Sequence, residues 1–531
     1  MSVSIEIVPF ADSLDMYGEP DRSAAYSISG HVVISMSNKS FLFPRRRAFR
    51  LLLRSLVVTF EGQSELLAHE TTYSAVRLCA ISQELAPGEP IELNAEDNDD
   101  MDKPCTWNVV FNLTVPGWLP PSSIFGDIQT GGETGTRYAL HASAKFESVD
   151  DCSASTWLST LCNPFRFSPL RTVKAPKCPI TLNRFMSTPY HASSSTSLFP
   201  LANYHVSAQP EARDEDDSSA RIPPHILSGL RVVCSVPEHV GTDEDTVPFS
   251  LRLRTTGLPE EDCKRLRVTE FAVDLEQHER YCTQPSTSYC AQYPVPPRRE
   301  QPPFKPLLSA HPVHSLYELG VAPYPPPRHV LARAFSIMPD DLSGRYTLAG
   351  NGYVFTQDAH AGDNVTWYSL STNIPVSHED IQVDKDWRAR RRLRSSGQSP
   401  LFDVNHRLLV TVVCTYDLID GNEPVRATER LNFCVPLRFV RVPPPSPSAS
   451  RTSSPSPMGF CSPSSSGRTS PCELPLPSLP YAQSLPAYSQ LFDSNGDRKI
   501  DYSVPLPLYT PREVDNKDEA PNEEENASTP S

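Results

Sequence analysis

Apolar and polar residues alternate strictly in several stretches of the N-terminal third of the chain. Every second residue is apolar in residues 109–115 and again in residues 138–146. Because alternate side chains of a strand point to opposite faces, this period of two predicts strands with one buried and one wet face. Further strands are predicted over residues 4–8, 26–36 and 53–60, and a turn is expected at Gly62.

The N-terminal part as a whole is predicted to be all-β. No segment before Met186 sustains an apolar period of 3.6 residues, which a surface helix would show. Seven or so strands separated by Gly, Pro and acidic loops are typical of two antiparallel sheets packed face to face. We therefore expect a β-sandwich over residues 1–186.

A second sandwich is predicted over residues 227–442. Residues 187–226 are polar and lack periodicity, so they are expected to be a linker. Strand patterning then resumes at residues 230–236, 248–254, 265–275, 402–415 and 427–439. A Pro-rich insertion at about 285–328 interrupts it. This insertion is longer than structureless loops usually are, so it is expected to be either disordered or used for binding.

Residues 443–531 are predicted to be a disordered tail. They contain 17 Pro and 18 Ser in 89 residues, with hardly any apolar clusters. Such a composition cannot bury enough apolar surface to offset the conformational entropy that folding costs.

Composition excludes several classes of protein. The net charge of −15 argues against a nucleic-acid binder, which needs a net basic face to neutralise phosphates. The 13 cysteines have scattered spacing and no CxxC pair, so reduced thiols in a cytosolic protein are expected, and zinc is not. The first 25 residues are acidic without an apolar run, unlike a secretory signal, and no stretch reaches the length of a membrane span.

No catalytic motif is found in the chain. There is no HExxH, GxSxG, P-loop or dinucleotide fingerprint. We therefore expect neither catalysis nor a cofactor nor a metal. A hydrolase or glycan-binding β-sandwich stays open as an alternative, and it would require polar side chains that converge in a pocket.

Two similar tyrosine strings lie in the tail. They are LPAY, with Leu485, Pro486 and Tyr488, and LPLY, with Leu506, Pro507 and Tyr509. A WW domain stacks a proline between two aromatic rings and seats a tyrosine two residues later, so this spacing fits its groove. Two weak sites on one flexible chain would also gain avidity. Coincidence in a tail rich in Leu, Pro and Tyr is the alternative.

Five Ser-Pro sites precede these strings. Phosphorylation there would add charge without disturbing a core, so regulation by proline-directed kinases is one interpretation. The other is that Ser and Pro only keep the tail in solution. The sites are Ser446, Ser454, Ser456, Ser462 and Ser470.

Two arginine clusters could contact an anion. Guanidinium groups bind phosphate with paired hydrogen bonds, so an anionic lipid or a phosphorylated client tail could bind there. Solvated loops are the alternative for both clusters. One contains Arg388, Arg390, Arg391, Arg392 and Arg394, and the other contains Arg45, Arg46 and Arg47.

Several fragments resemble the arrestin family, and more closely the fungal arrestin-related trafficking adaptors (α-arrestin-like). They are YSISGHVVI (26–34), SLVVTFEG (55–62), WNVVFNLTVPGWLPPS (107–122), YALHASAKF (138–146) and SPLFDVNHRLLVTVV (399–413) followed by NFCVPLRFV. The usual PPxY string of the family is absent, and only the LPxY variants are present.

The resemblance implies two tandem immunoglobulin-like β-sandwiches of the arrestin type that meet at a hinge and have no catalytic activity. It implies recognition of cytoplasmic tails of transporters or receptors and recruitment of a WW-domain HECT-class ubiquitin ligase, leading to ubiquitin-dependent endocytosis. Such an adaptor is cytoplasmic and peripheral at the plasma membrane and endosomes. The alternative is a non-enzymatic signalling scaffold whose tail binds phospho-dependent partners without a ligase.

Overall fold

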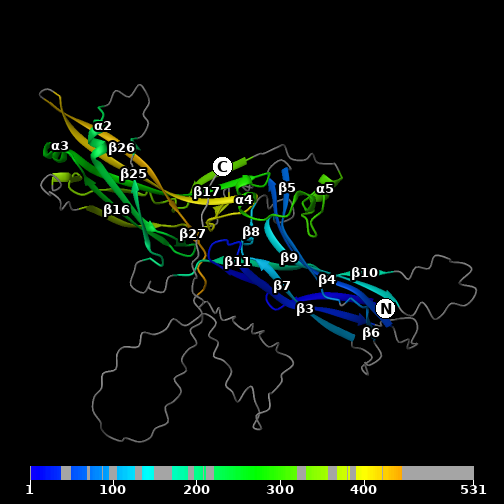
Figure 1. Cartoon of the computed structure of the whole chain (residues 1–531). Coiled ribbons are helices and arrows are strands. Elements are labelled where there is room, and N and C mark those ends of the chain that lie inside the picture. Colours follow the sequence, from blue (N-terminus) through cyan, green and yellow to red (C-terminus); the bar gives the residue numbers. More distant parts are fainter. Residues whose placement is uncertain are drawn as a thin grey trace, which may run out of the picture. The chain divides into compact units, whose positions relative to one another are not determined.

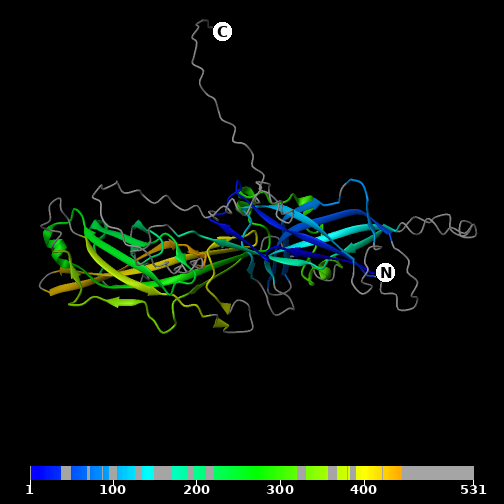
Figure 2. The ribbon, with the colours of Figure 1, turned by 90° about the horizontal axis from the view of Figure 1, so that it is seen from below.

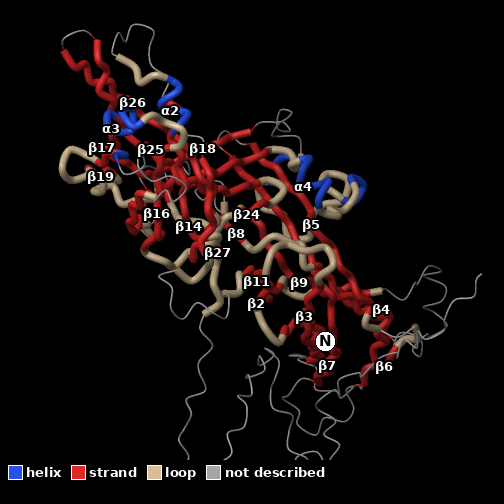
Figure 3. The backbone as a smooth tube through the Cα atoms, turned by 60° about the vertical axis from the view of Figure 1, so that its left-hand side comes forward, coloured by secondary structure: helices blue, strands red, loops and turns tan. Residues whose placement is uncertain are grey.

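The structure of the chain is a computed structural model, and strands carry most of its regular structure (Figures 1 and 3). The described part of the chain is all-β, and its α-helices have six residues or fewer. It consists of residues 2–37, 50–68, 72–86, 88–94, 105–125, 134–148, 170–188, 197–206, 209–210, 220–319, 330–356, 367–379, 381–382, 390–420 and 423–444.

The first pair of sheets is built from the N-terminal strands. The smaller sheet is antiparallel, in the order β1-β3-β7, and the larger has the order β2-β11-β9-β4-β5, with β6 on β4 and with β8 and β10 on β9. These strands are β1 (Ser2–Pro9), β2 (Ser13–Tyr17), β3 (Ala25–Ser37), β4 (Arg50–Ala68), β5 (Thr72–Glu84), β6 (Ile91–Asn94), β7 (Cys105–Pro116), β8 (Ser123–Ile124), β9 (Gly135–Ser148), β10 (Arg171–Lys174) and β11 (Cys178–Phe185).

Alternation decides which side chains of the first pair are buried. The antiparallel register places Ile5 opposite Ile34 and Ile34 opposite Trp107. In β9 the apolar alternate residues from Tyr138 to Phe146 are each at most 4% exposed. They join inward-facing residues of the smaller sheet in one hydrophobic core. The sequence pattern therefore identified both the strand and its inward face.

The second pair of sheets follows the first along the chain. Its smaller sheet has the order β12-β14-β16-β21, and its larger sheet β13-β26-β25-β17-β18, with β19 and β20 on β17 and β24 on β25. In Figure 2 the first pair is blue to teal and the second is green to orange. The strands are β12 (Leu201–Val206), β13 (Gln209–Pro210), β14 (Leu230–Pro237), β16 (Thr246–Thr255), β17 (Leu266–Cys282), β18 (Val330–Ser336), β19 (Arg345–Thr347), β20 (Tyr353–Val354), β21 (Tyr368–Pro375), β24 (Gly397–Gln398), β25 (Phe402–Asp420) and β26 (Glu423–Leu437).

Two small sheets and five short helices complete the described regular structure. Strands β15 and β27 pair in parallel, and strands β22 and β23 pair antiparallel. These elements are β15 (Val240–Gly241), β27 (Phe439–Val440), β22 (Ile381–Gln382), β23 (Arg390–Arg391), α2 (Pro224–Gly229), α3 (Glu260–Arg265), α4 (Thr287–Gln292), the 3₁₀ helix η4 (Arg298–Glu300) and α5 (His314–Glu318).

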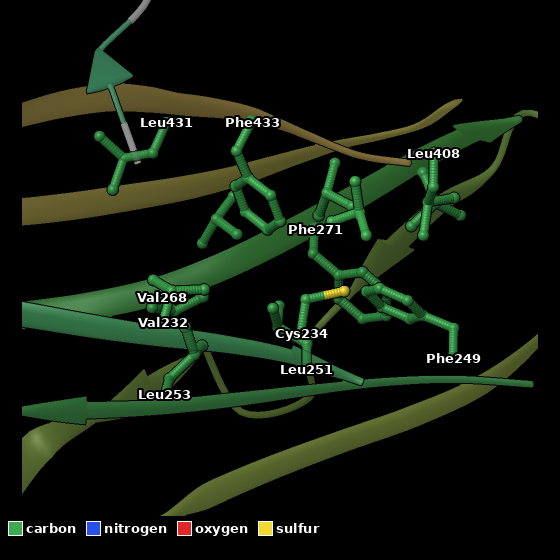
Figure 4. Close-up of a cluster of buried hydrophobic side chains, with 14 of the residues drawn as sticks. Val232, Cys234, Phe249, Leu251, Leu253, Val268, Phe271, Leu408, Leu431 and Phe433 are labelled. Atoms are coloured by element: carbon green, nitrogen blue, oxygen red, sulfur yellow. The ribbon is translucent and has the colours of Figure 1, made fainter. Parts of the chain in front are cut away.

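The second pair has a hydrophobic core of its own. Cys234 and Leu251 from the smaller sheet face Phe271, Leu408 and Leu431 from the larger sheet (Figure 4). These five side chains are at most 4% exposed. In each sheet pair, apolar side chains of the two sheets are thus buried against each other, as two packed β-layers require.

The predicted turn at Gly62 is wrong. Strand β4 continues through this residue to Ala68, with a register shift between Gly62 and Gln63 against β5. A Cβ at Gly62 would lie 2.6 Å from the ring of Tyr138 and 3.0 Å from Cys79 Sγ. Glycine is present there because neighbouring side chains approach the backbone closely, not because the chain turns.

The predicted linker at residues 187–226 is also wrong in part. Residues 201–206 form β12 along the edge of the smaller second sheet, paired with β14. The burial of β12 alternates between exposed and intermediate positions, as expected for an edge strand, and its half-buried Tyr204 and Val206 pack against the second core. Its composition therefore looks like that of a linker, although its backbone completes a sheet.

The described part of the predicted insertion is ordered. Residues 283–319, here called the docked insertion, leave β17 and lie against strands of the first sheet pair, beside β5 in Figure 1. Both sheet pairs belong to one unit, Met1–Pro447. The two predicted sandwich domains are therefore tied together by a segment that belongs to the second in sequence and contacts the first in space.

Candidate functional site

Many of the predicted site residues lie outside the described residues. This holds for both tyrosine strings, for the five Ser-Pro sites and for four of the arginines. They are Leu485, Pro486, Tyr488, Leu506, Pro507, Tyr509, Ser446, Ser454, Ser456, Ser462, Ser470, Arg45, Arg46, Arg47 and Arg388.

Two arginines of the cluster at residues 388–394 lie beside a surface hollow. Arg391 and Arg392 line this hollow, which has a volume of about 440 Å³. Arg390 precedes them in β23, and its side chain is not among the described ones. The hollow is also lined by residues 335–341, which include the end of β18, and by residues 376–379 after β21. The fold thus gathers three segments around two of the predicted arginines.

The charges of this hollow are mixed. Arg391 Nη1 lies 3.7 Å from Asp340 Oδ1, and both side chains are well exposed, so the pair is weak. Asp341 and Glu379 also line the hollow, beside Arg392. An anion would gain from the two guanidinium groups and be repelled by the three carboxylates. Anion binding at Arg391 and Arg392 stays a prediction.

Arg394 has a different role from its neighbours. Its Nε donates to Glu279 Oε1 at 3.0 Å, and its Nη1 donates to the carbonyl oxygen of Ile124 at 2.7 Å. Glu279 is fully buried and also accepts from Arg333 and Tyr281. Because its guanidinium compensates a buried carboxylate, Arg394 is occupied inside the fold.

Gln277 and His406 extend this buried network. Gln277 Nε2 donates to Glu279 Oε1 at 2.7 Å, and its Oε1 lies 3.1 Å from His406 Nε2. His406 Nδ1 lies 2.9 Å from the hydroxyl of Ser396. Burial, aided by His278, lowers the pKa of His406 to about 3. The neutral imidazole therefore donates from Nε2 to Gln277 and accepts at Nδ1 from Ser396.

Sequence reasoning did not find Gln277, Glu279 and Arg333. The signal that could have found two of them is parity: Gln277 and Glu279 occupy positions of β17 whose neighbours in the same alternation, Leu275 and Tyr281, are buried. A polar residue at an inward position of a strand indicates a buried hydrogen-bond partner. The identity of that partner depends on contacts between distant segments.

The described residues show no arrangement for metal chemistry. Within the described ranges, no group of three or more His, Cys, Asp or Glu side chains could hold a metal ion. The nine described cysteines are free thiols, and burial raises the pKa of Cys79, Cys234 and Cys414 to about 12. Thiols protonated to this degree are poor nucleophiles.

Comparisons with known proteins do not assign the chain to a family. No family model matches the chain. No curated protein matches it either. Among the helices of the described residues, none has both the length and the apolar composition needed to span a membrane. The features that bear on function are therefore the tyrosine strings of the tail, the two sheet pairs and their charged surfaces.

Proposed function

We propose that this chain is an arrestin-like adaptor that binds cytoplasmic tails of membrane proteins and recruits a WW-domain HECT-class ubiquitin ligase. The adaptor performs no chemistry itself. It raises the local concentration of the ligase around lysines of the bound client, and the outcome is ubiquitin-dependent endocytosis and sorting. Its place of action would be the cytoplasmic face of the plasma membrane and of endosomes.

The fold supports this proposal at a coarse level. Two successive pairs of β-sheets, each with its own hydrophobic core, are what two tandem arrestin-type, immunoglobulin-like sandwiches require. The fragments that resemble the arrestin family fall on strands of both pairs, such as β9 and β25. Proteins with this kind of fold bind partners through surfaces and loops, so the fold alone does not assign a client.

The observation that carries the proposal is the repeated LPxY string. In each copy a proline precedes a tyrosine by two residues, at Pro486 and Tyr488 and again at Pro507 and Tyr509. Proline biases the chain toward the polyproline II helix, which costs little entropy to bind. Two copies 21 residues apart allow one ligase with several WW domains to bind both, with an affinity above that of either.

A binding assay with the full chain tests this. We expect Tyr488→Ala and Tyr509→Ala together to reduce affinity for a tandem WW-domain protein by at least about tenfold, because each removes the ring that fills the second pocket. Tyr481→Ala is the matched control, since Tyr481 follows Pro480 directly and has the wrong spacing. Equal affinities of the wild type and the double variant would remove the ligase from the proposal.

A signalling scaffold without a ligase is the second candidate, and the five Ser-Pro sites favour it. In that case phosphorylation of the tail would create the binding site for a partner. Phosphorylated and unphosphorylated full chains should then differ in partner binding, while the double tyrosine variant behaves as wild type. The two candidates therefore give opposite results with the same set of proteins.

A further inference from the structure

Two parts of the docked insertion differ in how they contact the first sheet pair. They are here called the first or aromatic half, which precedes residue 300, and the second half, residues 300–311. The first half holds Tyr289 and Tyr293, which are 1% and 8% exposed and belong to the hydrophobic core of the first sheet pair. The ring of Tyr293 stacks on Trp118 with centroids 5.6 Å apart. Apolar burial on this scale holds the first half firmly against the first pair.

The second half, residues 300–311, contains turns and is bound largely through its main chain. The guanidinium group of Arg77 in β5 donates to the carbonyl oxygens of Glu300, Lys305 and Pro306, the last at 2.5 Å. The main chain of Arg77 also makes two bonds with the amide side chain of Gln301, at 2.7 and 2.9 Å. Arg77 is 1% exposed, so these bonds are shielded from water.

Strand β4 contributes three more side chains that contact this half. Glu61 Oε2 accepts from the main-chain nitrogen of Leu308 at 2.7 Å, and Glu65 Oε1 accepts from that of His311 at 2.7 Å. Gln63 Nε2 donates to the carbonyl oxygen of Ser309 at 2.8 Å. Glu61, Gln63, Glu65 and Arg77 are here called the polar row. The polar row contacts main-chain groups between residues 300 and 311, and the turns of this segment bring the carbonyl groups of Glu300 and Lys305 to the same guanidinium.

Because the polar row is charged and buried, the segment that covers it, residues 300–311, can leave and be replaced. Glu61 pairs with Arg77 at 2.7 Å, both about 1% exposed, and Glu65 pairs with Arg137. Ionised groups lose much hydration free energy on burial, and they recover it when a covering segment leaves. Release of residues 300–311 would expose the buried side chains of Leu307 and His311 but would leave Tyr289 and Tyr293 in the core, so it costs less than release of the aromatic half.

We propose that the polar row is a binding site for the main chain of a turned peptide segment, and that residues 300–311 are its tethered occupant. A partner segment that turns in the same way and offers free N–H and C=O groups takes their place. The tether gives residues 300–311 a high effective concentration, so the partner segment needs further contacts outside the row to displace them. The proposal does not depend on the tyrosine strings of the tail.

A peptide-binding assay with the full chain tests the site. The double variant Gln301→Ala and Leu308→Pro removes both side-chain bonds to Arg77 and the N–H that Glu61 accepts, without changing the polar row. The probe is a fluorescent synthetic peptide with the native sequence of residues 298–313, followed by anisotropy. We expect the double variant to bind the peptide at least about tenfold more tightly than wild type does, because its tethered competitor is weakened.

Two control peptides separate main-chain recognition from other binding. A scrambled peptide should bind neither chain, because the turns and the bonds of Gln301 to Arg77 depend on the order of the residues. A peptide methylated on the nitrogen of Leu308 should lose most of its affinity for the double variant. A folded double variant that binds no native peptide, or binds all three peptides alike, would overturn the proposal.

Hydrogen exchange on the wild-type chain decides the matter if the double variant does not fold. We expect the amides of Leu308 and His311 to exchange by local opening, well before those of α4 in the aromatic half. Equal protection of both halves, lost only on global unfolding, would show that residues 300–311 do not leave the row.

Discussion

At the scale of single residues, burial decides the protonation of His406. This side chain is 2% exposed, and the pKa falls from the ordinary 6.5 to about 3 because an imidazolium would lose its hydration there. The neutral ring is bonded at both nitrogens, to Gln277 and Ser396. Between these two pKa values the unfolded chain binds a proton that the folded chain does not.

His406 therefore predicts a loss of stability in acid. The free energy of unfolding should fall as pH falls from 6.5 towards 3, and about 2 kcal/mol of the loss between pH 7 and 5 should come from His406. Urea unfolding of wild type and His406→Asn at both pH values measures this. The variant should lose less stability between them, whereas His225→Asn, at an exposed position, should behave as wild type. An equal loss in His406→Asn would contradict the assignment.

At the scale of the element, the irregularity in β4 shapes the first core. Gly62 leaves room for Tyr138, whose ring stacks on Phe60 with centroids 5.6 Å apart. The hydroxyl of Tyr138 donates to the carbonyl oxygen of Pro120 at 2.6 Å. Because this ring is fixed at both ends, it cannot move aside for an added methyl group.

We predict that Gly62→Ala destabilises the chain by about 1–3 kcal/mol through overpacking. Chemical denaturation of the full chain measures the change. Gly397→Ala is the matched control, since a Cβ at Gly397 in β24 meets nothing within 4 Å. Similar effects of both substitutions would show that backbone flexibility, rather than the contact with Tyr138, explains the glycine.

At the scale of the whole molecule, a small apolar cluster joins the two sheet pairs. Phe125, which follows β8, stacks on Phe402 of β25 with centroids 4.6 Å apart, and Tyr281 packs on the same ring. Leu66 and Val76 of the first pair complete the contact. Together with the docked insertion, this cluster couples the folding of the two pairs.

Phe125→Ala should weaken that coupling. We expect a loss of about 3–5 kcal/mol and a thermal transition that separates into two, because each pair keeps its own core. Phe249→Ala is the control: Phe249 is 2% exposed within the second core, so its loss should lower stability without uncoupling the pairs. Scanning calorimetry distinguishes the results, and a single unbroken transition in Phe125→Ala would contradict the coupling.

Local patterns were sufficient to predict most strands and their inward faces. In β9 the alternation from Tyr138 to Phe146 predicted the buried side, since the period of a strand is a property of consecutive residues. The same reasoning did not identify β12, although Ala202, Tyr204 and Val206 alternate with polar residues, because this short edge strand lies within a long polar stretch. It also interpreted Gly62 as a turn, since the reason for that glycine lies in Tyr138, 76 residues further along the chain.

Neighbouring residues alone were enough to reveal the all-β class, the approximate strand positions and the tyrosine strings. Which charged side chains are used inside the fold depends instead on contacts between distant segments. The tertiary structure paired Arg394 with Glu279, and it placed Arg77 beside the main chain of residues 300–306. These partners are 115 residues or more apart in sequence, and only folding brings them within hydrogen-bonding distance.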